Sequence, residues 1–192
     1  MKKQKIISAE NAADLGVFAL LAIYPLIITD RYFNLTLTKY IFFTVTSAFF
    51  FALCLIIKIY GIDNHCVIKK PELSNFSLTD IFITLFTLIA TISCFSSEHV
   101  IASISGGAGR RMGLIMIFSL FFAYMFISKF YRIKENDFML FGAVSIFMSF
   151  VALLQYNGVN VFSLQDGLSD WDKYRFLSFS GNINIFSSFI CI

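Results

Sequence analysis

The sequence has 192 residues, of which 58% are hydrophobic and 14% are charged, and its mean hydropathy is +0.78. Soluble domains carry about a quarter charged residues, so this composition excludes an ordinary water-soluble fold and indicates a chain whose main solvent is lipid. The net charge of +3 gives no reason to expect a nucleic-acid partner. The Lys and Arg residues lie in short clusters between apolar segments, where they set membrane orientation, and form no basic face.

Five apolar segments bracketed by charged or polar residues predict transmembrane helices, and a sixth begins near the C-terminus. The predicted spans are residues 15–29, 40–57, 81–97, 112–128, 138–154 and, incomplete, 183–192. Most hold 17 or 18 residues, about 26 Å of helix against a hydrocarbon core of about 30 Å. We therefore predict an all-α fold, a polytopic transmembrane helix bundle of five spans plus a truncated sixth. Residues 1–192 would form a single transmembrane region with lipid as its main partner.

The first span is the shortest of the five and contains Pro25. It needs the preceding Ala12 and Ala13, or a locally thinned bilayer, to cross. The basic residues before it imitate a signal peptide, but no small-residue cleavage site follows the apolar run. We expect a retained first helix.

The distribution of basic residues predicts a cytoplasmic N-terminus. On that topology nine Lys and Arg lie inside and six lie outside. The six outside are Arg31, Lys39, Arg110, Arg111, Lys173 and Arg175. They run against the positive-inside tendency and invite a functional explanation.

The cysteines and histidines give little indication of chemistry. The four cysteines have no CxxC spacing and are best interpreted as small apolar packing residues. His65 and Cys66 could ligate a metal, and Glu98 with His99 could form an acid–base pair, but neither has a supporting cluster. We expect no metal site and no cofactor.

The most unusual loop runs from Ser103 to Gly113 with the sequence SISGGAGRRMG. Its glycines allow tight turns and close backbone approach. Arg110 and Arg111 stand where the fourth predicted span begins, and paired guanidinium groups beside a helix start suit a phosphate or pyrophosphate. The alternative is a plain turn with interfacial anchors. No strand precedes the glycines and no Lys-Ser/Thr follows them, which excludes a P-loop or Rossmann interpretation.

A second polar stretch runs from Asp170 to Asn184. Trp171 and Tyr174 could stack on a sugar ring or lie in the headgroup layer, and Asp166, Asp170 and Asp172 could bind polyol hydroxyls or only solvate a loop. Arg175 is followed by Asn182 and Asn184 at the start of the last predicted span. Asparagine is costly in hydrocarbon, so two of them indicate a polar cavity or interhelical hydrogen bonds.

Taken in order, these landmarks resemble the O-antigen ligase/polymerase family of membrane enzymes. The resemblance rests on residues 24–26, 32–33 and 39–43, on the Gly-Gly-Ala-Gly-Arg-Arg-Met-Gly turn at 106–113, and on Arg175 with Ser-Gly-Asn-Ile-Asn at 180–184. It covers essentially all of the sequence, but only the N-terminal part of such an enzyme. Ile183 stands where the family usually has proline, and the family's large external loop with its catalytic histidine would lie beyond Ile192.

The resemblance implies transfer of a glycan from an undecaprenyl-pyrophosphate carrier to an acceptor at the outer face of a bacterial plasma membrane. It implies that Arg110, Arg111 and Arg175 bind the diphosphate, with Asn182 and Asn184 beside them. No catalytic residue is expected in these 192 residues, so a truncated fragment would be inactive alone. Two alternatives stay open: a transporter or lipid flippase component, and a non-catalytic membrane subunit that packs against partner helices.

Overall fold

The computed structural model describes residues 8–60, 77–107 and 111–191. The described chain is mostly helical, and its only paired strands form one short hairpin. The chain is divided into two compact units. The first comprises Met1–Val17 and Phe43–Arg132, and the second comprises Phe18–Phe42 and Ile133–Ile192.

Four helical stretches are long and apolar enough to cross a membrane. These are Ala9–Leu26, made of α1 (Ala9–Phe18), the π-helical turn η1 (Ala19–Ile23) and α2 (Tyr24–Leu26), together with α3 (Leu35–Ile59), α4 (Leu78–Phe95) and α7 (Glu135–Tyr156). A fifth apolar helix, α6 (Leu114–Phe130), is shorter. Large apolar side chains are exposed along them, as in Phe82, Phe86 and Ile89 of α4. Such surfaces are stable in lipid, so the chain is a membrane-type helical protein.

The first helix lies earlier in the sequence than the predicted span at 15–29. Ser8 starts it by accepting a hydrogen bond from the Asn11 backbone through its side-chain oxygen, 3.1 Å, and the helix ends at Leu26 because Ile27 turns to an extended conformation. The shift includes Ala12 and Ala13 and gives 18 residues. The other helices contain or overlap the predicted spans, with ends displaced by a few residues.

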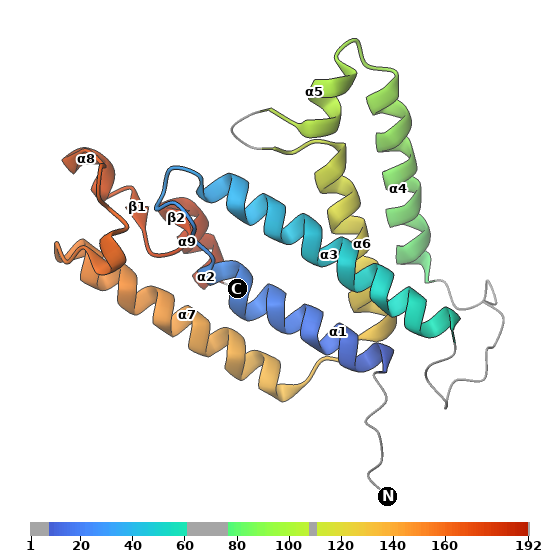
Figure 1. Cartoon of the computed structure of the whole chain (residues 1–192), viewed down its shortest axis with the longest axis horizontal. Coiled ribbons are helices and arrows are strands. Elements are labelled where there is room, and N and C mark those ends of the chain that lie inside the picture. Colours follow the sequence, from blue (N-terminus) through green and yellow to red (C-terminus); the bar gives the residue numbers. More distant parts are fainter. Residues whose placement is uncertain (1–7, 61–76, 108–110, 192) are drawn as a thin grey trace, which may run out of the picture. The chain divides into compact units, whose positions relative to one another are not determined.

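In the first unit, α4 packs beside α6, and the short helix α5 (Val100–Ser105) lies at one end of both (Figure 1). Asp80 is buried near the start of α4, where its carboxylate accepts hydrogen bonds from Tyr124 (2.8 Å) and Lys129 of α6. Phe51 of α3 stacks on Phe122 of α6, with ring centroids 5.1 Å apart. An ion pair and stacked aromatic rings therefore hold these helices together.

The glycine-rich turn between α5 and α6 requires glycine at two positions. Gly106 has φ +74°, and a Cβ on Gly113 would overlap the backbone of Gly106 and Ile104. These two glycines therefore pack backbone to backbone. This explains part of the Gly-Gly-Ala-Gly-Arg-Arg-Met-Gly pattern without a ligand.

In the second unit, the segment after α7 folds back onto that helix. It contains η3 (Val161–Ser163), α8 (Asp170–Lys173), the hairpin of β1 (Phe176–Leu177) and β2 (Gly181–Asn182), and α9 (Ile183–Ile190). Figure 1 shows this segment in orange and red at the end of α7. Its apolar core joins Val144, Met148 and Ala152 of α7 to Leu177 and Phe186.

Candidate functional site

The segment between α7 and β1 is an ordered structure held together by one glutamine. Gln165 is 4% exposed. Its Nε2 donates to the carbonyls of Lys173 (2.9 Å) and Phe176 (3.3 Å), and its backbone N–H donates to Asn160 Oδ1 at 3.0 Å. These three bonds tie the part of the loop around η3 to α8 and β1.

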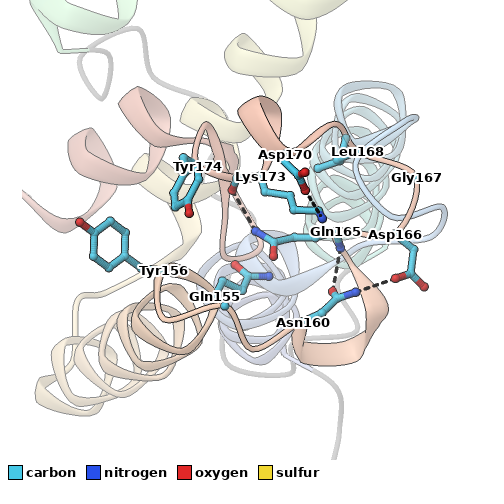
Figure 2. Close-up of a pocket in the computed structure, with 11 residues that line it drawn as sticks. Gln155, Tyr156, Asn160, Gln165, Asp166, Gly167, Leu168, Asp170, Lys173 and Tyr174 are labelled. Atoms are coloured by element: carbon cyan, nitrogen blue, oxygen red, sulfur yellow. Dashed lines mark hydrogen bonds and ion pairs between the residues drawn. The ribbon is translucent and has the colours of Figure 1, made fainter.

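A cavity of about 410 Å³ opens in this segment at the C-terminal end of α7 (Figure 2). A volume of this size is within the range of small-molecule sites, about 300–1,000 Å³. Its lining combines amides, carboxylates, an ammonium group and two phenols with glycine and leucine. The lining residues are Gln155, Tyr156, Gly158, Asn160, Gln165, Asp166, Gly167, Leu168, Asp170, Lys173 and Tyr174.

Each carboxylate in the lining has a cationic partner. Lys173 Nζ donates to Asp170 Oδ1 at 2.7 Å, and this bond lowers the pKa of Asp170 and raises that of Lys173. Asp166 lies 3.5 Å from the Arg31 guanidinium and also accepts from Asn160 Nδ2 at 2.6 Å. The formal charges of these two ion pairs cancel, so the site carries no strong anionic or cationic field.

A buried polar network adjoins the cavity through Gln155, which belongs to both. Gln155, 3% exposed, accepts the Ser178 N–H at Oε1 (2.6 Å) and donates from Nε2 to the Tyr32 hydroxyl (3.1 Å). Tyr32 in turn donates to the Ser178 carbonyl at 2.6 Å, and the Ser178 hydroxyl donates to the Met148 carbonyl at 2.7 Å. Burial raises the pKa of Tyr32 to about 12, against a smaller lowering by the Gln155 hydrogen bond. The network fixes the hairpin turn, where Ser178 adopts φ +56°.

The residues predicted to bind the diphosphate are not all described within one unit of the chain. Arg110 lies outside the described residues, Arg111 belongs to the first unit, and Arg175 belongs to the second. Arg175 stacks over the Trp171 ring, with its guanidinium carbon 5.1 Å from the ring centroid. The convergence of the three arginines on one anionic site stays a prediction.

Asn182 has a local structural role. Its side chain accepts the Asn184 N–H at 2.8 Å and so caps the start of α9. Both asparagines are exposed, and neither lines the cavity. The capping bond satisfies a helix donor and explains one of the two asparagines without a ligand.

Among the remaining sequence candidates, Glu98 and His99 are not lining residues of this cavity. Glu98 and His99 are exposed in the first unit, and the potential metal ligands His65 and Cys66 lie outside the described residues. Within residues 8–60, 77–107 and 111–191, no group of three His, Cys, Asp or Glu residues is placed to hold a metal ion.

Several residues that the sequence analysis named as possible sugar-binding residues line the cavity. Asp166, Asp170 and Tyr174 line it, whereas Trp171 and Asp172 do not. Sequence reasoning missed Gln155 and Gln165, which appeared only as the end of a predicted span and as a loop residue. A glutamine at the end of an apolar run was the one available signal.

Comparison with known proteins brings no match: no family model, no curated protein and no solved structure is similar to this sequence.

Proposed function

We propose that the protein acts on lipid-linked glycans as part of a membrane enzyme of the O-antigen ligase/polymerase type. The observation that carries the proposal is the polar cavity at the end of the apolar helix α7. A lipid-linked saccharide likewise has an apolar part and a polar part. Its polyprenyl chain partitions into hydrocarbon, while its sugar and diphosphate remain at the interface.

The chemistry proposed is glycosyl transfer. An acceptor hydroxyl oxygen forms a bond to the anomeric carbon of the glycan as the bond from that carbon to the diphosphate oxygen breaks. Arg110, Arg111 and Arg175 stabilise the departing diphosphate through bidentate hydrogen bonds, which removes the need for a metal at that step. In the family that the sequence resembles, a histidine of the large external loop accepts the hydroxyl proton.

The first test is a chromosomal deletion of the gene, with mass spectrometry of the lipid-linked glycans. We expect a polyprenyl-pyrophosphate glycan to accumulate on the outer leaflet, accessible to a glycosidase added to intact cells. Accumulation on the inner leaflet would instead identify a flippase component. Unchanged lipid-linked glycans would overturn the proposal.

The second test replaces each arginine by lysine, which keeps the charge but loses the guanidinium fork. Glycan transfer in cells that carry Arg110→Lys, Arg111→Lys or Arg175→Lys should fall at least about tenfold, equivalent to about 1.4 kcal/mol in the barrier, at unchanged membrane levels. Lys39→Arg is the control, since it alters an external basic residue that this role does not involve. Wild-type transfer in all three lysine variants would reduce the arginines to interfacial anchors.

A further inference from the structure

We infer that the cavity at the end of α7 binds an uncharged saccharide and that Gln165 provides its central hydrogen-bond acceptor. The inference rests on the proposed function in one respect, because it assigns the sugar part of the substrate to a specific place. The observations behind it are different from those behind the proposed function and concern only the residues that line the cavity.

The first observation is the state of the Gln165 amide. The two hydrogen bonds from Nε2 go to backbone carbonyls, those of Lys173 and Phe176. A carbonyl accepts and cannot donate, so this arrangement fixes which end of the amide is nitrogen. The Oε1 atom therefore points elsewhere, and it accepts no hydrogen bond from the residues that the structure describes. Figure 2 shows the Gln165 side chain among the other lining residues.

The hydroxyls of Ser47 and Ser145 are the described side-chain atoms that are fully buried without a partner, and Gln165 Oε1 is not among them. This oxygen is therefore accessible and can accept a hydrogen bond from a ligand. Gln165 is 4% exposed and lines the cavity. A hydroxyl group is a suitable donor for this oxygen.

The second observation is the charge of the lining. Asp166 and Asp170 are both present, and Lys173 and Arg31 already engage them. Because both cations are already paired with these carboxylates, neither is left to bind a phosphate or a uronic acid. An uncharged polyhydroxyl ligand needs no such cation and can donate hydrogen bonds to the carboxylates.

The third observation is the pair of tyrosines at the rim. Tyr156 and Tyr174 are 66% and 63% exposed, and their rings meet edge to face with centroids 6.4 Å apart. Sugar rings present apolar C–H faces beside their hydroxyls, and an exposed aromatic ring can cover such a face. Amide, carboxylate and phenol groups together provide what a saccharide requires.

The test measures binding of the 192-residue chain, reconstituted in lipid nanodiscs, to an array of neutral, uronic-acid-containing and amino-sugar oligosaccharides. We expect binding to neutral members and at least about tenfold weaker binding to acidic members. Trp171 is the only tryptophan of the chain and lies between Asp170 and Lys173, so its fluorescence reports the same binding in solution. Absence of neutral binding, equal binding of acidic sugars, or binding of amino sugars alone would overturn the inference.

Two matched pairs of variants locate the site. Tyr174→Leu should weaken neutral binding at least about fivefold, whereas Trp171→Leu, in the adjacent helix but outside the lining, should leave array binding unchanged. Asp170→Asn should improve binding of acidic sugars, whereas Asp172→Asn makes the same change at a position that does not line the cavity. Equal effects within either pair would contradict the assignment.

Gln165→Leu tests the acceptor directly, with circular dichroism and nanodisc elution as checks that the helices persist. Should this variant fail to fold, Tyr174→Leu and Asp170→Asn still test the inference, because both leave the Gln165 hydrogen bonds in place. Loss of sugar binding in this assay with intact glycan transfer in cells would refute the cavity but not the proposed function. Intact sugar binding with no role in glycan transfer would refute the proposed function but not the cavity.

Discussion

Tyr32 shows how much one side chain contributes to the second unit. It is 7% exposed, its hydroxyl bonds to Ser178 and Gln155, and its ring lies 5.6 Å from that of Phe176. Sequence reasoning placed it only as part of a resemblance. Its role in joining the loop before α3 to the hairpin depends on contacts across more than a hundred residues, which no local pattern predicts.

Removal of the Tyr32 hydroxyl should destabilise the protein. Tyr32→Phe keeps the ring but leaves the Ser178 carbonyl and the Gln155 amide without a buried partner, at a cost of about 1–3 kcal/mol. Thermal unfolding of the purified chain in detergent, followed by circular dichroism, measures this change. Tyr60→Phe, at a residue that is 76% exposed, should alter stability by less than about 0.5 kcal/mol. Equal effects of the two variants would contradict the network.

The raised pKa of Tyr32 predicts a pH dependence at the alkaline end. The folded state holds the phenol proton to a pKa of about 12, against 10.0 for an ordinary tyrosine. Because the folded state then binds more protons than the unfolded state, stability should be unaffected below pH 10 and fall as the pH rises from 10 to 12. Phenolate absorbance should show a late-titrating component that belongs to Tyr32. A titration unchanged by Tyr32→Phe would contradict this assignment.

At the scale of elements, the ion pair between α4 and α6 replaces apolar packing at one end of these helices. Asp80 combines two roles: it completes a capping box with Ser77 and accepts from Tyr124 and Lys129. It is 1% exposed. A buried carboxylate with this many donors is stable only while they all remain.

Asp80→Asn should therefore be strongly destabilising, by about 3–5 kcal/mol, because it leaves Lys129 partly buried without its carboxylate. Asp137 is the matched control, since it forms the same capping bond at the start of α7 and is more exposed. Asp137→Asn should cost about 1 kcal/mol. Both are measured by unfolding in mixed micelles. A double variant, Asp80→Asn with Lys129→Met, should be more stable than the sum of the single effects.

Several elements were predictable from the sequence for simple physical reasons. The apolar runs of α3, α4, α6 and α7 need no tertiary information, because lipid selects for composition along the helix. The first helix begins at Ala9, ahead of Asp14, the charged residue that borders the predicted span at 15–29. The ordered loop was not predictable: its structure depends on Gln155, Gln165 and Ser178, whose hydrogen bonds follow from the fold and not from spacing.

At the scale of the whole molecule, the topology determines which surfaces meet which side of the membrane. We predict a cytoplasmic N-terminus, with residues 98–111 and 155–181 outside. An alkaline phosphatase fusion after Gly158 should be active, and one after Lys134 should be inactive, because this enzyme folds only outside the cytoplasm. A green fluorescent protein fusion should give the opposite pattern. The reverse result would move the cavity to the cytoplasm and exclude its proposed role in glycan transfer.

The π-helical turn at Ala19–Ile23 affects how the sequence of the first helix can change in evolution. Such a turn holds one residue more than an α-helical turn spans, and it typically arises from a single inserted residue. A deletion within it would restore regular α-helix and preserve the side-chain faces on either side. The same deletion in α7 would rotate every following residue by about 100°. Length variation among relatives should therefore concentrate at this turn, which gives the helix a one-residue tolerance that the other spans lack.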